Sequence, residues 1–585
     1  MPPKKSSKRH GSQQSVNAAV KGICNIMRRS DCAGALQYVP ELTWILFLRI
    51  LDEREESEIE NTKALGIAFT PTLAEPFRWR DWAAPESARR KGEGEFRGFS
   101  AWDFVHDELL PHLHDLKKQA GATPRQKVVS EIMARVKESA IDTEKNFLDV
   151  LDAVHEITTE SVDDTHVFTL SQVYEGLLLK MGEMGNDGGQ FFTPREVIRA
   201  MVQVVAPQIG ETVYDPGCGT GGFLAQAFEH MKGKAKSAVD LAKLKQRTFF
   251  GREKDTHIYP IALLNLVLHG IDEPRIWHGN TLSKTAVSET LFQGAPAFFD
   301  VVLMNPPFGG KEGAEAQTHY EYKTNATQVL FLQNVLQSMK KDSRCGIVLD
   351  EGVLFRVDSE AHVKTKRKLL EECDVWCIVS LAGGVFTAAG AGVKTNLVFF
   401  TKGKATERIW YYDLADVKVG KKTPMTLAQF KDFFDLLPTR GDSEQSWTID
   451  FAERVQKTLD DAAPHRAQAE ASQGEAKGLE AEWRAAKKKH GADDSATRAA
   501  FDKWNTKARE AREALAKAEV VENAAYDLKA VNPNRVTTED RRTPTDLLKE
   551  IEMRGQEADA ALGQLRALLS AGESIVEAYG APAAR

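Results

Sequence analysis

The chain has 585 residues and a formal net charge of -7 at pH 7, so we expect more than one domain. Hydrophobic residues make up 42% of the chain. That content supports sizeable cores, and no apolar run approaches the roughly twenty residues of a membrane span. The six cysteines stand singly, which argues against a zinc site and a disulfide framework. The mild acidity argues against a surface that is basic throughout, although a local basic groove is sufficient for DNA.

The N-terminal part of the chain is expected to be helical. The first ten residues, MPPKKSSKRH, are basic and precede no apolar run, which argues against a secretory signal. Residues 1–14 are expected to be a disordered arm, either solvated or touching phosphate. Residues 15–160 are expected to form a helical domain. Its clearest element is ELTWILFLRILDEREE, an apolar core flanked by charges, as in a buried helix.

Short apolar runs alternate with helical segments between residues 165 and 425. Strand–helix–strand alternation predicts an α/β domain with a parallel sheet covered on both faces. A glycine-rich stretch too short for a crossover helix joins the last two runs, which favours an antiparallel hairpin at one edge of the sheet. The strand candidates are Thr212–Tyr214, Thr248–Phe250, Phe299–Met304, Cys345–Leu349, Val375–Leu381 and Asn396–Thr401.

The composition shifts to Ala, Glu, Lys and Arg beyond about residue 455, and residues 455–585 are expected to be helical. Two runs with three-four apolar spacing flank Gly491 and Asp493, which predicts a long antiparallel helical hairpin. A later helix is expected to start at Thr543 and Pro544, a cap followed by a first-turn proline.

The glycine-rich segment YDPGCGTGGF, Tyr214–Phe223, follows a strand candidate and opens a helix. Its glycines let the backbone turn sharply and approach a ligand closely. The helix N-terminus offers free N–H groups to a carboxylate or phosphate. The pattern is neither GxGxxG nor a Walker loop, and the alternative is a plain tight turn.

Two further segments end strand candidates with polar side chains. Glu253, in FFGREKD, ends the second candidate, where an acid can accept two hydrogen bonds from ribose hydroxyls. In FFDVVLMNPPFG a buried strand ends at Asn305. Ligands of doubly wound sheets bind at the carboxyl ends of strands, where the strand order reverses. We therefore expect the loops after the first and fourth strands to face each other across one crevice.

The residues Asn305, Pro306, Pro307 and Phe308 suit an amine as methyl acceptor. The Asn305 amide oxygen and the Pro306 carbonyl can both accept hydrogen bonds from one NH₂ group and aim its lone pair at an electrophilic methyl. The prolines stiffen the loop and remove competing donors, and Phe308 offers a flat face to a planar base. The alternative is a proline-rich turn capped by a core phenylalanine.

This ordered set of motifs resembles the gamma-type amino-methyltransferases, specifically the modification subunits of type I restriction-modification systems. The resemblance covers most of the chain and is weakest over the helical hairpin. It implies a prokaryotic, cytoplasmic enzyme with a doubly wound, Rossmann-like sheet that uses S-adenosylmethionine to methylate N6 of a flipped-out adenine in DNA. The matching segments are GQFFTPREVI, YDPGCGTGGFL, NLVLHGI, FDVVLMNPPFG, TNLVFFTKG, WILFLRILD and YDLKAVNPNR.

The resemblance also implies roles for single residues. Asn305 to Phe308 would hold the target adenine, Asp215 would lie beneath the methionyl group, and Glu253 would hold the cofactor ribose. Asn280 stands where such enzymes often carry Asp, so it could meet the cofactor adenine as donor or acceptor. Cys218 is expected only to pack. The segment that would close over the methionine end is Gln190, Phe191, Phe192, Thr193, Pro194 and Arg195. The loop residues that would line the cofactor are Gly217, Gly219, Thr220, Gly221 and Gly222.

No zinc finger, clear helix-turn-helix or strongly basic domain is visible, so we expect a partner to recognise the DNA sequence. The resemblance implies double-stranded DNA, a specificity subunit, a motor-nuclease restriction subunit and a second copy of this chain as partners, and no membrane. The hairpin either docks a partner or covers its own chain.

Three alternative functions stay open. A protein glutamine N5 methyltransferase also presents an amide to Asn-Pro-Pro and an aromatic ring. The chain could instead be a scaffold with a vestigial pocket, or the methylating subunit of another phage-defence system.

Overall fold

The computed structural model describes residues 22–30, 35–64, 69–134, 136–156, 193–289, 291–386, 393–420, 423–534, 552–556 and 558–563. Met1–Asn532 form one compact unit and Pro533–Arg585 a second. In the second unit, residues 552–556 and 558–563 are helical. The helix expected from Thr543 and the arm expected over residues 1–14 lie outside the described residues. Within the described ranges, no helix is long and apolar enough to cross a membrane.

The described residues before 157 are helical apart from their connections, as predicted. In α2 the residues from Leu42 to Leu48 are buried, and Trp44 lies against Phe147 with ring centroids 6.3 Å apart. Thr143 caps the helix that contains Phe147 by accepting a hydrogen bond from the Asn146 N–H. The helices are α2 (Ala35–Ala64), α3 (Trp79–Trp82), α4 (Ala88–Lys91), α5 (Ala101–Phe104), a π-helical turn (Val105–Leu109), α6 (Leu110–Asp115), α7 (Pro124–Met133) and α8 (Glu144–His155).

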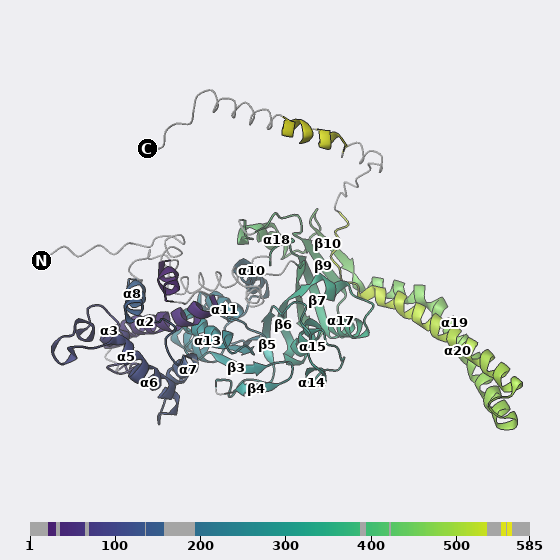
Figure 1. Cartoon of the computed structure of the whole chain (residues 1–585). Coiled ribbons are helices and arrows are strands. Elements are labelled where there is room, and N and C mark those ends of the chain that lie inside the picture. Colours follow the sequence, from purple (N-terminus) through teal and green to yellow (C-terminus); the bar gives the residue numbers. More distant parts are fainter. Residues whose placement is uncertain are drawn as a thin grey trace. The chain divides into compact units, whose positions relative to one another are not determined.

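A ten-stranded mixed sheet forms the middle of the first unit (Figure 1), in the order β10-β9-β7-β8-β6-β5-β1-β2-β3-β4. The strands β3, β2, β1, β5 and β6 pair in parallel, as the strand–helix alternation predicts. The strands are β1 (Val213–Asp215), β2 (Phe249–Glu253), β3 (Arg275–Asn280), β4 (Thr285–Ser288), β5 (Phe299–Met304), β6 (Met339–Asp350), β7 (Cys373–Ser380), β8 (Thr395–Lys402), β9 (Arg408–Asp413) and β10 (Ser446–Asp450).

Helices cover both faces of the sheet, and strand residues alternate between the two cores. Val301 and Leu303 of β5 join the core beneath α10, α11 and α13. Val302 and Met304 join the core beneath α15, α16 and α17. The helices are α10 (Arg195–Val205), α11 (Gly222–Lys232), α12 (Ala238–Gln246), α13 (Ile258–His269), α14 (Ala314–Gln317), α15 (Thr327–Ser338), α16 (Glu351–Phe355), α17 (Glu360–Glu372) and α18 (Lys431–Leu436).

The predicted hairpin of the last two strand candidates is antiparallel, but its expected place at the edge of the sheet was wrong. β8 inserts between β6 and β7 and is antiparallel to both. β9 and β10 then extend the sheet beyond β7. The aromatic residues of β9, Trp410, Tyr411 and Tyr412, are all buried. The sheet therefore contains two more strands, β9 and β10, which were not among the strands predicted from the sequence.

The helices α19 (Phe451–His490) and α20 (Ser495–Asn523) form the predicted antiparallel hairpin. Arg466 pairs with Glu522 near one end, and the rings of Trp483 and Trp504 stack 5.0 Å apart near the other. Small residues lie between the helices, which lets the two backbones approach closely. The chain then returns to the sheet, where Tyr526 and Leu528 are buried.

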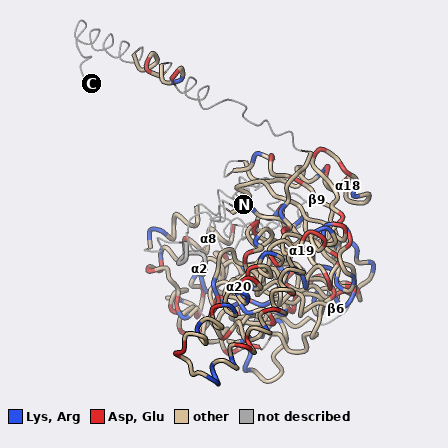
Figure 2. Tube along the Cα trace, turned by 90° about the vertical axis from the view of Figure 1, so that its right-hand side faces the viewer, with Lys and Arg blue, Asp and Glu red and all other residues tan. Residues whose placement is uncertain are grey.

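Charged residues of both signs are interspersed along the trace seen in Figure 2, which agrees with the small net charge. One acid nevertheless gathers three cations. Asp272 follows α13 and pairs with Arg54 of α2 at 2.5 Å, Arg125 of α7 at 3.1 Å and Lys245 of α12 at 3.5 Å. The N-terminal helices are thus tied to the helices that flank the sheet through one carboxylate.

We predict that Asp272→Asn lowers the free energy of unfolding by about 1–3 kcal/mol, because three partly buried cations lose their common counter-charge. Burial raises the pKa of Asp272, but Arg54, Lys245 and Arg125 outweigh it and hold the pKa below the ordinary value of 3.8. The contribution is therefore present at neutral pH and is lost as the pH falls through and below that value. Thermal or urea unfolding measures the change.

The matched control is Asp435→Asn, which removes an exposed acid that pairs with Lys431 on α18. That variant should change the unfolding free energy by less than about 0.5 kcal/mol, as exposed pairs do. Equal effects of the two substitutions would show that Asp272 does not join the two groups of helices.

Candidate active site

The glycine-rich loop runs from the end of β1 to the start of α11 and requires glycine at several positions. Gly219 and Gly221 adopt positive φ angles of 53° and 78°, a region that residues with a Cβ rarely enter. A Cβ on Gly217 would lie 3.0 Å from the Met304 Cε at the end of β5. The loop therefore passes close to the Met304 side chain at the end of the neighbouring strand.

Three side chains hold this loop in place, each from a different element. The Gly219 N–H donates to Glu253 Oε2 at 2.9 Å. Asn265 of α13 donates through Nδ2 to the Thr220 carbonyl at 2.8 Å, and the Thr281 hydroxyl donates to the Pro216 carbonyl at 2.7 Å. Only Glu253 was predicted as a site residue. Of the other two, Asn265 could have been recognised from the sequence, because it is an amide within an otherwise apolar helix, where it is buried and needs a hydrogen-bond partner.

Two buried carboxyl groups lie at the loop. Asp215 accepts a hydrogen bond from the Gly217 N–H at 3.0 Å, and the second oxygen of Glu253 accepts one from the Asp255 N–H at 2.7 Å. Burial raises the pKa of Asp215 to about 8 and that of Glu253 to about 7. Near neutral pH, a cationic or hydroxyl-bearing ligand that pairs with these groups would stabilise their charged forms.

The N-P-P-F segment begins where β5 ends. The Asn305 Nδ2 donates to the Thr193 Oγ1 at 2.9 Å, while Oδ1 of the same amide is buried and has no partner among the described residues. Phe308 is partly buried and meets Phe386 edge to face at 5.4 Å. Because the Asn305 nitrogen is already hydrogen-bonded and its buried oxygen is not, that oxygen can accept a hydrogen bond from a ligand.

The two loops meet where the order of the strands reverses. β1 pairs with β5 on one side and β2 on the other, so Asp215, Glu253 and Asn305 all end neighbouring parallel strands at one edge. This confirms the expected juxtaposition of the strand that precedes the glycine-rich loop and the strand that ends before Asn305. The crevice at such a reversal is where doubly wound sheets bind ligands.

The remaining predicted residues that the structure describes lie around this edge. Thr193 and Pro194 precede α10. Burial of Arg195, and after it the positive charge of Arg199, lower the pKa of the Arg195 guanidinium to about 10. The Asn280 Oδ1 accepts hydrogen bonds from the N–H groups of Leu282 at 2.9 Å and Ser283 at 3.4 Å. The residues outside the described ranges are Gln190, Phe191 and Phe192.

One cysteine, Cys218, lies within the glycine-rich loop. Cys218 is buried, its Sγ lies 3.0 Å from where a Cβ on Gly251 would be, and burial raises the pKa of its thiol well above 9.0. It packs within the core, as expected. Within the described ranges, no three His, Cys, Asp or Glu residues gather as metal ligands would.

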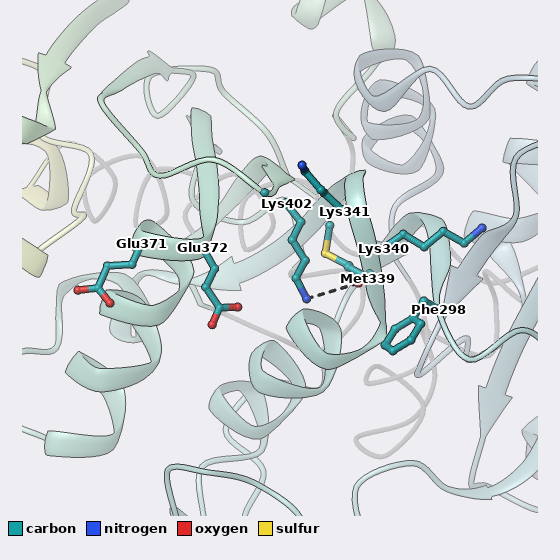
Figure 3. Close-up of a pocket in the computed structure, with 8 residues that line it drawn as sticks. Phe298, Met339, Lys340, Lys341, Glu371, Glu372 and Lys402 are labelled. Atoms are coloured by element: carbon teal, nitrogen blue, oxygen red, sulfur yellow. Dashed lines mark hydrogen bonds between the residues drawn. The ribbon is translucent and has the colours of Figure 1, made fainter.

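A separate pocket of about 560 Å³ lies at the opposite edge of the sheet (Figure 3). Its wall contains Phe298 and Met339, at the amino ends of β5 and β6, and Lys402, at the carboxyl end of the antiparallel β8. The Lys402 ammonium donates to the Leu336 and Met339 carbonyls at 2.5 and 3.4 Å. That lysine closes the end of α15, and the pocket is remote from Asn305 along the strands.

The glycine loop fits a nucleoside-bearing cofactor with a methionyl group. Its glycines carry no side chain that would occupy the space of a ligand, and Glu253 retains lone pairs for ribose hydroxyls beyond the two backbone donors that it already binds.

Residues 165–472 match the family of N-6 DNA methylases, and residues 16–153 match the HsdM N-terminal domain.

The chain is 34% identical to the type I restriction enzyme EcoEI methylase subunit of Escherichia coli, over 74% of this chain and 87% of that one. It is 29% identical to the EcoKI methylase subunit, over 68% and 71%.

Two solved structures are similar over most of their length. One, from work on complex assembly and conformational transition of the type I R-M system, shares 31% identity with a TM-score of 0.63, covering 96% of this chain and 99% of that one. The modification subunit of a putative type I restriction enzyme from Vibrio vulnificus shares 30% with a TM-score of 0.64, covering 77% and 94%. With this site and these matches, the chain belongs to the N-6 DNA methylase family, as an S-adenosylmethionine-dependent, adenine-specific methylase subunit of type I restriction systems.

Proposed function

We propose that Asn305, Pro306, Pro307 and Phe308 hold the adenine that this enzyme methylates. The observation that carries the proposal is the buried and unpaired Asn305 Oδ1 at the carboxyl end of β5. Together with the Pro306 carbonyl, that oxygen accepts the two hydrogens of the adenine N6 amine and orients the nitrogen lone pair. Phe308 lies against the base, and flipping the base out of the duplex costs a few kcal/mol.

The glycine-rich loop and Glu253 are the proposed cofactor side of the crevice. S-adenosylmethionine supplies an electrophilic methyl group when bound. Glu253 accepts hydrogen bonds from the ribose hydroxyls, and Asp215 lies beneath the methionyl end. The residues of the loop that line the cofactor are Gly217, Gly219, Thr220, Gly221 and Gly222. The preceding segment closes over the methionine end of the cofactor, with Gln190, Phe191, Phe192, Thr193, Pro194 and Arg195. Asn280 uses its oxygen within its own loop, which leaves the NH₂ group as its means of contacting the cofactor adenine.

We propose that residues 165–425 form the domain that catalyses methyl transfer. Residues 15–160 form the N-terminal helical domain, and residues 455–585 form a helical region through which the chain joins its partners. Those partners are double-stranded DNA, a subunit that reads the DNA sequence, a motor-nuclease subunit and a second copy of this chain. The dock for the sequence-reading subunit is the hairpin of α19 and α20, because it keeps apolar side chains exposed: Leu459, Phe501, Leu515 and Val520.

We predict that Asn305→Ala abolishes methylation and leaves the affinity for S-adenosylmethionine nearly unchanged, because Asn305 binds the acceptor amine and not the donor. Methyl incorporation into unmethylated DNA measures the first quantity and calorimetry the second. The control is Asn325→Ala, which removes an amide that precedes α15. Near-normal turnover of Asn305→Ala would contradict the proposal that residues 305–308 hold the adenine.

We predict that Glu253→Ala weakens S-adenosylmethionine binding by about 1.5–3 kcal/mol, the usual loss for charge-assisted hydrogen bonds. The wild-type affinity should also fall as the pH is lowered through about 7, where this buried carboxyl takes up a proton. The variant should lose the part of that pH dependence that Glu253 contributes and keep the part that Asp215 contributes, since burial raises the pKa of Asp215 to about 8. Titration calorimetry between pH 6 and 8 tests both, with the exposed Glu360→Ala as the charge control. Unchanged affinity in Glu253→Ala would mean that other residues hold the ribose.

We predict that the isolated chain methylates DNA slowly and without sequence preference, and that a partner subunit raises both rate and specificity. Replacing residues 467–521 by a short turn should weaken that complex by about 10-fold or more. The cut keeps the anchors Tyr526 and Leu528 and should leave cofactor binding intact.

Single substitutions refine this test of the hairpin. Leu515→Ser should weaken the complex, whereas Leu241→Ser on α12, a leucine with the same exposure of 37%, should not. An unaffected complex in the shortened chain would show that the hairpin is not the dock. Efficient modification of one defined sequence by the chain alone would overturn the partner proposal.

A further inference from the structure

The side-chain amide of Asn305 has two possible orientations, which differ in whether its oxygen or its nitrogen faces the substrate. The Asn side chain is nearly symmetric in shape, but its oxygen accepts hydrogen bonds and its nitrogen donates them. An adenine amine brings two donors to the pocket. If the Asn305 nitrogen faced the pocket, donors would meet donors, so the orientation of this amide decides whether the proposed site works.

One hydroxyl lies at the nitrogen end of that amide. The Asn305 Nδ2 donates to the Thr193 Oγ1 at 2.9 Å, and the opposite atom, Oδ1, is buried without a partner among the described residues. The hydroxyl oxygen has two lone pairs, so it can accept from Asn305 and still donate its own proton. One hydrogen of the amide nitrogen is therefore bound inside the protein, and the amide oxygen remains for the substrate.

Thr193 is itself held in a fixed position. It precedes Pro194, whose carbonyl accepts the N–H groups of Val197 at 3.0 Å and Ile198 at 3.1 Å in the first turn of α10. Both of those side chains are buried, and the Ile198 Cδ1 lies 3.0 Å from where a Cβ on Gly222 would be. The start of α10 is therefore packed against the start of α11, which fixes the hydroxyl relative to the glycine-rich loop.

We propose that Thr193 is a positioning residue for methyl transfer: its hydroxyl oxygen holds the Asn305 nitrogen so that the amide oxygen faces the incoming adenine amine. The inference rests on the proposed role of Asn305. The role belongs to the Thr193 hydroxyl alone, whereas the backbone of Thr193 stays within the segment proposed to close over the cofactor, and replacing the side chain leaves that backbone in place. A packed helix start thus sets the direction of a catalytic hydrogen bond on a neighbouring strand end.

The test replaces the hydroxyl by groups of similar size. Thr193→Val keeps the shape and removes the oxygen, whereas Thr193→Ser keeps the oxygen and removes the methyl. The single-turnover rate of methyl transfer to unmethylated DNA is measured with the full-length chain in its complex, at saturating S-adenosylmethionine and DNA. Calorimetry gives the cofactor affinity. Thr193→Ala, which also lacks the oxygen, repeats the test if the valine variant is poorly folded.

We expect Thr193→Val and Thr193→Ala to lower the saturated rate by about 10-fold or more, as the loss of one buried hydrogen bond would. Their cofactor affinity should stay within about 2-fold of the wild type, since the donor still meets the same loop. Thr193→Ser should restore most of the rate. Thr281→Val gives the contrast, because its hydroxyl holds the glycine-rich loop and its loss should lower cofactor affinity first.

Two results would overturn the inference. If Thr193→Val loses cofactor affinity and saturating S-adenosylmethionine restores the full rate, Thr193 is a cofactor ligand and not a positioning residue. A rate and an affinity both equal to the wild type would show that the hydroxyl has no role. Asn305→Ala separates this failure from a wider one: an inactive Asn305→Ala beside a normal Thr193→Val removes only the inference, whereas an active Asn305→Ala removes the proposed site as well.

Discussion

The backbone of the glycine-rich loop has to pass within van der Waals contact of the end of β5, and the rest of the site is arranged around that approach. β1 and β5 are neighbours in the sheet, and Gly217 has only about 3.0 Å between its missing Cβ and Met304. The residue after Met304 is Asn305. A larger residue at 217 would require the end of the Met304 side chain to move by a few tenths of an ångström, directly beside Asn305.

The polar groups at this edge are unusual because they are buried before any ligand is present. Asp215, Glu253 and Asn305 each place at least one polar atom away from water. Burial raises the pKa of both carboxyl groups, so the protein without ligand loses stability from them as the pH rises from about 4 to about 8. A buried acceptor is strong toward a matching donor because no water competes for it. The site therefore trades some stability of the empty protein for recognition.

Local sequence patterns were sufficient to predict the strands that carry the motifs. β5 was predicted at its observed bounds, and the hairpin of α19 and α20 turns at the expected glycine and aspartates. The position of β8 between β6 and β7 was not predictable, since strand pairing is a long-range choice that apolar alternation does not encode. β9 was missed although its residues are buried, because its aromatic run lies outside the strand–helix alternation that guided the prediction.

The same limit applies to the site. The glycine loop, Glu253 and Asn305 are readable from sequence because their chemistry depends on local spacing. Asn265, Thr281 and Thr193 act through hydrogen bonds to residues 45, 65 and 112 positions away. A hydroxyl or amide looks the same in sequence whether it faces water or a catalytic group, so only the fold reveals its partner.

The account stands on the transfer of a methyl group to the exocyclic nitrogen of adenine, and one measurement addresses that directly. S-adenosylmethionine carrying a CD₃ group is incubated with the full-length chain, its partner subunits and unmethylated DNA. The DNA is digested to nucleosides for mass spectrometry, and the proteins present are digested to peptides. The account predicts label in N6-methyladenine alone. Label in a protein glutamine or in cytosine, or no label in DNA from a complex that binds the cofactor, would contradict it.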